Sequence, residues 1–176
     1  MQQEELSYPL ERGENKTVVE ARRELLESLT SGGSICPCCG ANVKPYKVSI
    51  TSKMLRELRW LVDESGAVDG ASIYPQQAKF VDFASAPPDI RASRTISKLR
   101  FFGLVEKKMR LSSDGKESEV QGMWRPTTNG IKFSLNMIKI QTRSIVFRGE
   151  VISTVGPSEG ARDVMLRGAN EVYDEP

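Results

Sequence analysis

The sequence has no histidine in its 176 residues, and its three cysteines all fall within four neighbouring positions. Histidine is the commonest general base in enzymes, so its absence argues against most triad and proton-transfer chemistry. The motifs GxxxxGK[ST], GxGxxG, GxSxG and HExxH, which mark nucleotide, hydrolase and metalloprotease sites, are also missing. We therefore expect a protein that is not an enzyme.

Long apolar runs are absent as well. No stretch approaches the ~20 residues that an apolar helix needs to cross a bilayer. The first residues, MQQEELSYPLERGENK, are polar and acidic, unlike a secretory signal. Three clustered cysteines cannot build a disulfide framework. These features predict a protein of the reducing cytoplasm without membrane association.

The net charge is only +2, but the charges are unevenly distributed. Residues 1–30 contain seven acidic and four basic side chains, and residues 149–176 are acidic too. Residues 40–60 are basic, and residues 89–112 contain seven basic and two acidic side chains. A basic centre between acidic ends is typical of a polyanion-binding surface. Chance clustering of solvated charges is the alternative.

Apolar periodicity and turn residues divide the chain into four predicted segments. They are an acidic arm and helix (1–34), a cysteine loop with a basic strand (35–50), a central domain (51–136) and a C-terminal β-hairpin with a short helix (137–176). The first segment is expected to contain a loose arm at 1–14 and a helix at 15–30. That helix would pack on the main domain or form a homodimer with a second copy.

The central domain is expected to mix helices and strands. Helices are predicted at 51–64, 75–84 and 89–102, with a short strand at 67–74 that pairs with a later hairpin. The helix at 89–102 has an apolar face, and its other face is formed by Arg91, Arg94, Thr95 and Lys98. Gly103 ends this helix, and two strands follow on either side of a polar loop.

Two motifs in this region resemble winged helix-turn-helix proteins. Leu99, followed by Gly103-Leu104-Val105-Glu106, resembles the end of their recognition helix. The run from Trp124 to Gly130, with Phe133, resembles their wing strand and exit helix. The resemblance implies an α+β fold: a winged helix-turn-helix with an N-terminal helix and cysteine knuckle and a C-terminal β-hairpin extension. An ordinary α+β domain whose helix has a solvated basic face is the alternative.

The whole arrangement from about Ile35 to Val164 resembles small uncharacterised proteins of bacteriophages and prophages. The shared features are a CPxCG knuckle, a SKLRxxGL[VI]E helix and a GxWRxTxxG strand. The resemblance implies a phage origin, a place in the cytoplasm of the bacterial host cell and a DNA-binding fold. A regulator of phage transcription or replication is the function that we expect from it.

In such a protein the recognition helix would lie in the major groove of double-stranded DNA, while the wing meets the backbone or minor groove. The predicted DNA-binding residues are Arg91, Arg94, Thr95, Lys98, Lys107, Lys108, Arg110, Lys116, Lys53 and Arg56. Arg100 is expected to be solvated, and the expected core includes Ile96, Leu99, Phe80 and Trp124. The alternative function is an adaptor or inhibitor that binds a host or phage protein through the same face.

The run Cys36-Pro37-Cys38-Cys39-Gly40 resembles the zinc knuckle of zinc ribbons, with Cys36 and Cys39 as the two metal ligands. Structural zinc takes four ligands, usually cysteine or histidine, and one chain has too few. A second copy could supply its own Cys36 and Cys39, or Cys38 and a carboxylate or water could complete the site. A turn without metal and a Cys36–Cys39 disulfide are the other interpretations.

Overall fold

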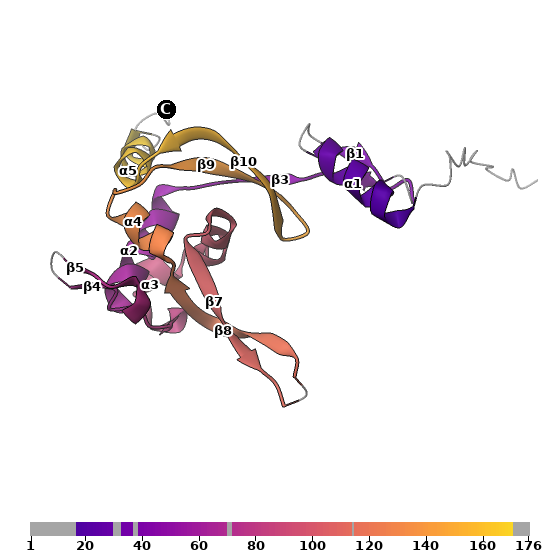
Figure 1. The fold of residues 1–176 in the computed structure, drawn as a ribbon. Coiled ribbons are helices and arrows are strands. Elements are labelled where there is room, and N and C mark those ends of the chain that lie inside the picture. The colour runs from indigo at the N-terminus through magenta and orange to yellow at the C-terminus, as the bar shows by residue number, and fades with distance from the viewer. Residues whose placement is uncertain (1–16, 30–32, 37–38, 70–71, 114, 171–176) are drawn as a thin grey trace, which may run out of the picture. The chain divides into compact units, whose positions relative to one another are not determined.

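The computed structural model describes residues 17–29, 33–36, 39–69, 72–113 and 115–170 (Figure 1). It divides into two compact units, Met1–Pro45 and Tyr46–Pro176. The division falls inside the predicted 35–50 segment, so the cysteine loop and the basic strand after it belong to different units. Helices and strands both occur, as predicted for an α+β protein. The predicted arm at 1–14 lies outside the described residues.

The elements follow one another in a mixed order. The helices are α1 (Val18–Leu29), α2 (Ser52–Glu64), α3 (Pro88–Arg91), α4 (Thr128–Ser134) and α5 (Ala161–Asn170), with the 3-10 helices η1 (Pro75–Gln77), η2 (Phe83–Ser85) and η3 (Ile96–Phe102). The strands are β1 (Ser34–Ile35), β2 (Asn42–Val43), β3 (Tyr46–Ser49), β4 (Val68–Asp69), β5 (Ser72–Ile73), β6 (Val81–Asp82), β7 (Val105–Leu111), β8 (Glu117–Pro126), β9 (Ile140–Phe147) and β10 (Glu150–Glu159).

The first unit contains α1 and the β1–β2 hairpin. The Glu20 N–H donates to the Thr17 hydroxyl at 3.3 Å, while the Thr17 N–H donates to the Glu20 carboxylate at 2.9 Å. This reciprocal capping box fixes the start of the helix. α1 packs against β1, and Leu29 at its end is buried. The helix predicted over 15–30 is therefore confirmed over Val18–Leu29.

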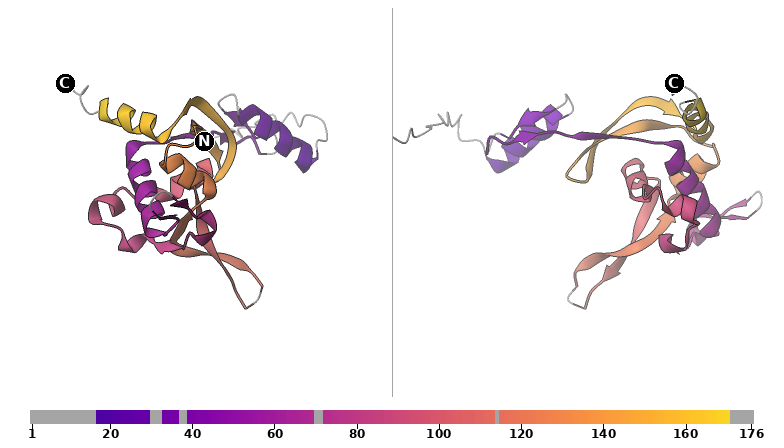
Figure 2. Two further views of the ribbon diagram at one scale, coloured as in Figure 1. Left: turned by 60° about the vertical axis from the view of Figure 1, so that its left-hand side comes forward. Right: turned by 180° about the vertical axis from the view of Figure 1, so that it is seen from behind.

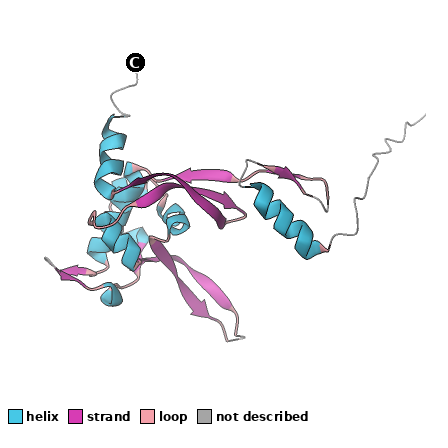
Figure 3. Cartoon of the chain, turned by 45° about the horizontal axis from the view of Figure 1, so that its top comes forward, coloured by secondary structure: helices cyan, strands magenta, loops and turns pink. Residues whose placement is uncertain are grey.

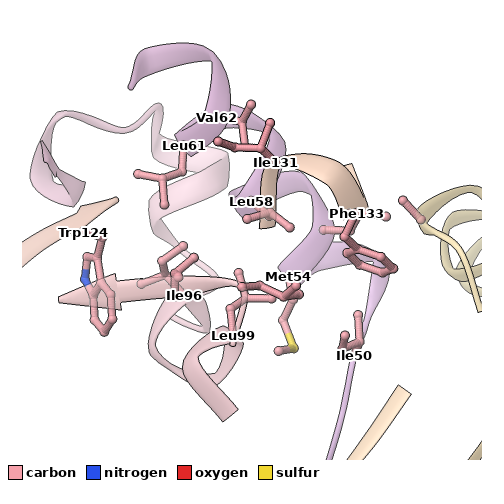
Figure 4. Close-up of a cluster of buried hydrophobic side chains, with 14 of the residues drawn as sticks. Ile50, Met54, Leu58, Leu61, Val62, Ile96, Leu99, Trp124, Ile131 and Phe133 are labelled. Carbon is pink, nitrogen blue, oxygen red and sulfur yellow. The ribbon is translucent and has the colours of Figure 1, made fainter. Parts of the chain in front are cut away.

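α2 is the central helix of the second unit. It begins where predicted, since the Thr51 hydroxyl accepts a hydrogen bond from the Met54 N–H at 3.3 Å. Its apolar face is fully buried and consists of Met54, Leu55, Leu58, Leu61 and Val62. Later elements cover this face with Ile96, Leu99, Trp124, Ile131 and Phe133 (Figure 4). Of the expected core residues, Ile96, Leu99 and Trp124 are buried, whereas Phe80 is only partly buried.

Two three-stranded antiparallel sheets complete the second unit, with the strand orders β6–β8–β7 and β10–β9–β3. β7 and β8 form a long hairpin that projects beyond the helices (Figures 2 and 3). β9 and β10 form the predicted C-terminal hairpin, joined by Arg148 and Gly149 at φ of +51° and +82°. Two successive positive φ values suit the twist of a tight hairpin. The basic strand predicted within the segment 35–50 is split at Pro45 into β2 and β3, because proline has no N–H for the ladder.

Residues 67–84 differ from the prediction. The strand expected at 67–74 is instead the separate β4–β5 hairpin, which pairs with itself and not with β8. The helix expected at 75–84 is also wrong, since η1, β6 and η2 occupy these residues. Within them Val81 of β6 pairs with Trp124 of β8. This long-range pairing outweighs the local helical period of the sequence.

The helix predicted over 89–102 is wrong as a single helix. α3 ends at Arg91, and η3 begins only at Ile96. Between them Arg94 has a left-handed φ of +48°, which a continuous right-handed helix cannot contain. Gly103 ends η3 at φ +65°, as the sequence predicts.

The two motifs that resemble winged-helix proteins contact each other. The Thr127 N–H donates to the Leu104 carbonyl at 3.0 Å, and the Thr127 hydroxyl donates to the Gly103 carbonyl at 2.6 Å. The same hydroxyl accepts from the Gly130 N–H at 3.0 Å and so caps α4. A Cβ on Gly130 would lie 2.0 Å from the Leu104 carbonyl oxygen. Backbone contacts that need a glycine therefore close the base of the β7–β8 hairpin.

Replacing Gly130 with alanine is expected to destabilise the fold, because the methyl group overlaps the Leu104 carbonyl and one backbone segment must move. Overpacking of this kind costs about 1–3 kcal/mol. Urea unfolding followed by the fluorescence of Trp60 and Trp124 measures the change. Asn129→Ala, at the exposed neighbouring position, is the control and should change the free energy of unfolding by less than about 0.5 kcal/mol. Equal stability of the two variants would contradict the contact.

Candidate nucleic-acid interface

A buried carboxylate on α2 holds the turn between α3 and η3. Glu57 is 0% exposed. It accepts hydrogen bonds from the Thr95 N–H at 3.0 Å, from the Thr95 hydroxyl at 2.8 Å and from the Ser93 hydroxyl. A buried carboxylate is costly unless donors surround it, and this turn supplies three. The position of the turn on α2 is therefore fixed by Glu57.

This turn exposes Arg94 and Lys98. Arg94 has its left-handed backbone between two residues that are bound to Glu57, and they hold it in a conformation that costs a non-glycine residue about 1–2 kcal/mol. Lys98 lies one turn later, and its N–H donates to the Thr95 carbonyl at 2.9 Å. Both side chains are exposed, as the sequence predicts for DNA-binding residues.

The single helical face predicted for Arg91, Arg94, Thr95 and Lys98 does not form, because α3 ends at Arg91 and η3 begins only at Ile96. The Arg91 guanidinium donates to the Ala84 carbonyl at 3.0 Å. Thr95 is half-buried and directs its hydroxyl to Glu57. Arg94, with its left-handed backbone, interrupts the helix on which that face depends. Both side chains have partners within the fold.

Two further predicted cations, Lys53 and Arg56, are exposed on α2. They are three residues apart and therefore lie on the same side of the helix. Both line a shallow depression on the surface, together with Asp89, Ile90, Ala92 and Ser93 of α3 and the turn. The cations of α2 thus lie beside the turn that contains Arg94. Lys53, Arg56, Arg94 and Lys98 are called the basic cluster below.

The β7–β8 hairpin has two different faces near its tip. Cross-strand pairing and alternation place four side chains on one face, namely Met109, Leu111, Glu117 and Glu119. On the other face Arg110 pairs with Ser118, and Lys116 follows at the next alternate position. Lys108 lies at an irregularity in the ladder. Lys108, Arg110 and Lys116 are all exposed, so the hairpin presents cations mainly on one face.

Lys107 interacts with two side chains of β8, its neighbouring strand. Its ammonium group forms an ion pair with Glu119 and lies 5.2 Å from the centre of the Trp124 ring. Arg100, which the sequence suggests is solvated, also contacts Glu119 at 3.5 Å. The hydrogen bond from Lys107, with the charges of Lys107 and Arg100, lowers the pKa of the Glu119 carboxyl below its ordinary value despite some desolvation. Among the predicted wing cations, Lys107 is thus matched by an acid.

The β10–β9–β3 sheet covers one side of η3. The Ser144 hydroxyl donates to the Phe101 carbonyl at 2.9 Å. The Tyr46 ring meets the Phe101 ring edge-on, with centroids 6.4 Å apart. The Arg100 guanidinium lies 5.2 Å from the centre of the same ring. The side of η3 that contains Phe101 is therefore covered by this sheet, whereas Lys98 is exposed.

The predicted metal ligands lie in the first unit, at the end of the β1–β2 hairpin. Cys36 is half-buried and Cys39 is exposed, while Cys38 lies outside the described residues. The Cys36 N–H donates to the Ala41 carbonyl at 2.8 Å, and the Gly40 N–H donates to the Cys36 carbonyl at 2.9 Å. Within the described part of the chain no three cysteine, aspartate or glutamate side chains gather as a metal site.

Glu57 is the important residue that the sequence analysis missed. It follows Met54 by three positions and precedes Leu61 by four, and both of these are buried. Helical spacing therefore places a carboxylate on the apolar face of α2. A charged side chain on a buried helix face requires hydrogen-bond or ionic partners. This pattern in the sequence could have identified Glu57. Nothing local indicates that the partners are Ser93 and Thr95.

The fold is thus of the α+β class, with exposed cations on α2, in the α3–η3 turn and near the start of η3. No family model, curated protein or solved structure matches this chain. The resemblances to winged-helix and bacteriophage proteins therefore remain predictions from sequence motifs. None of the helices among the described residues is long and apolar enough to cross a membrane.

Removing the Glu57 carboxylate is expected to destabilise the protein by about 2 kcal/mol, because the half-buried N–H and hydroxyl of Thr95 lose their acceptor and a donor left without a partner costs about 1–3 kcal/mol when it is buried. Glu57→Ala tests this by urea unfolding. Glu57→Gln keeps one acceptor and should lose less stability. Glu64→Ala removes an exposed carboxylate from the same helix and is the control. If Glu57→Ala is as stable as Glu64→Ala, the carboxylate does not hold the turn.

Lys107→Met is expected to raise the pKa of Glu119, because the hydrogen bond from Lys107 is the main cause of its lowering. Carboxyl NMR titration measures this pKa, and Lys108→Met, at the exposed next position, is the control. A lowered pKa in the folded state gives stability that is present above the unfolded-state pKa and lost as the pH falls through the folded-state pKa. Lys107→Met should therefore lose less stability in acid than the wild type. An unchanged titration would contradict the pairing.

Proposed function

We propose that residues 51–136 form a winged-helix domain that binds double-stranded DNA, and that the protein is a DNA-binding regulator of transcription or replication, not an enzyme. The order α2, β6, α3, η3, β7, β8 and the sheet order β6–β8–β7 support this assignment. In it η3 takes the place of the recognition helix, and the β7–β8 hairpin takes the place of the wing. A phage origin stays part of the proposal through the sequence motifs alone.

The basic cluster is the observation on which this proposal depends. Glu57 joins α2, on which Lys53 and Arg56 are exposed, to the turn that contains the exposed Arg94. Double-stranded DNA has a dense row of phosphates, and cations that neutralise them supply most of the non-specific affinity. In the proposed complex Lys53 and Arg56 contact phosphates, while Arg94 and Lys98 approach the groove.

The two faces of the wing suggest its orientation. The face with Arg110 and Lys116 would meet the phosphate backbone, since its cations attract that backbone. The opposite face has Glu117 and Glu119, which phosphates would repel. Lys107 contributes little to binding in this proposal, because Glu119 already balances its charge.

Binding of a mixed-sequence duplex, measured by fluorescence anisotropy at several salt concentrations, tests the proposal. The variant Arg94→Ala/Lys98→Ala is expected to bind more weakly and to flatten the log–log salt dependence by up to about 2 units, since each lost phosphate contact removes about 0.9. Lys53→Ala/Arg56→Ala should have a similar effect.

The matched control is Lys132→Ala/Lys139→Ala, which removes the same charge from exposed positions outside the cluster. It should leave the salt dependence nearly unchanged. If it weakens binding as much as the cluster variants do, the cluster is not the interface. If the wild type does not bind DNA even at low salt, the proposed function is wrong.

A second candidate function is an adaptor or inhibitor that binds a host or phage protein. The observation that favours it is the wing face with Met109 and Leu111, which are 48% and 68% exposed. Exposed apolar side chains of this size are more typical of a protein contact than of a DNA contact. Affinity for one protein that survives Arg94→Ala/Lys98→Ala but not Leu111→Ser would support this candidate.

A further inference from the structure

The described residues of the cysteine loop, Cys36 and 39–41, lie at the end of the β1–β2 hairpin. β1 and β2 pair with Ile35 opposite Asn42, and two hydrogen bonds between Cys36 and residues 40 and 41 close the loop. Gly40 has φ +70°, and nothing lies within 4 Å of a Cβ placed there. Glycine is therefore favoured there for its backbone conformation and not for lack of space. The loop keeps Cys36 and Cys39 at one end of the hairpin.

Two cysteines separated by two residues are half of a structural zinc site. Zinc in such sites is tetrahedral and bound by four cysteine or histidine ligands, often as two C-x2-C pairs. This chain has three cysteines and no histidine, so a single copy cannot provide four such ligands. The described residues offer no cluster of three candidate ligands either.

We infer that two copies of this chain share one zinc ion, and that each copy supplies the thiolates of Cys36 and Cys39. The four sulfurs then form a complete set of thiolate ligands, and zinc binding links the two first units. Cys38 is not a ligand in this arrangement. The inference does not depend on DNA binding, because it concerns residues of the first unit only.

Thiolates suit zinc better than they suit magnesium or calcium, which prefer oxygen ligands. Each bound cysteine must lose its proton, so zinc binding releases protons and weakens at low pH. Sharing one zinc ion between two copies also explains why each chain has only part of the ligand set. A single chain would have to complete its zinc site with oxygen ligands.

The test uses the full chain with a phosphine reductant and added zinc chloride. Elemental analysis should find one zinc ion for two chains, and light scattering should give the mass of a dimer that returns to a monomer when a chelator is added. One zinc ion per chain in a monomer would overturn the inference. So would a zinc-free chain, or iron in place of zinc.

Single substitutions identify the ligands. Cys36→Ser and Cys39→Ser should each abolish zinc binding and the zinc-dependent dimer, whereas Cys38→Ser, the matched control, should keep both. Loss of zinc in Cys38→Ser would overturn the proposed ligand set. Circular dichroism checks that the variants fold. Cobalt titration of the wild type gives a second measurement, because tetrahedral cobalt(II) with thiolate ligands has characteristic visible absorption bands, and their absence would also overturn it.

Discussion

The buried carboxylate of Glu57 is the interaction on which the architecture of the central domain depends. It lies on the apolar face of α2, where an ionised group is stable only with hydrogen-bond donors around it. Ser93 and Thr95 supply these donors. Because they flank Arg94, the same bonds stabilise a left-handed residue and end the helical run after α3. These bonds connect α2 to the segment between α3 and η3.

The β7–β8 hairpin is fixed by a second backbone contact at the other end of η3. Thr127 binds the carbonyls of Gly103 and Leu104, and Gly130 has no Cβ to keep α4 away from them. η3 is thereby held between the Glu57 network and the base of the β7–β8 hairpin. This geometry gives a physical reason for the two sequence motifs to occur together. Thr127 of one motif donates hydrogen bonds to carbonyl groups of the other, and Gly130 leaves the space that the Leu104 carbonyl needs.

The sequence predicted well the elements that local signals determine. α2 with its Thr51 cap, the end of η3 at Gly103, and both long hairpins follow from caps, turns and periodicity. Residues 67–102 were predicted poorly, because contacts distant in sequence decide them: β6 pairs with β8, and Glu57 binds residues 93 and 95. Lys53 and Arg56 are exposed on α2, as the predicted helix requires. The common face predicted for Arg91, Arg94, Thr95 and Lys98 fails with the single helix on which it depended.

The C-terminal sheet limits what the proposed recognition helix could read. It occupies the Phe101 side of η3 through Ser144 and Tyr46, and Arg100 is directed to Glu119 and the Phe101 ring. The remaining surface consists of the start of η3 and the cations of α2. Such a surface offers many charges for phosphates and few side chains for base edges, and phosphate contacts position a protein without specifying a sequence. In the proposed complex, affinity would therefore come mainly from charge, and sequence preference would have to come from Lys98, Arg94 or the shape of the DNA.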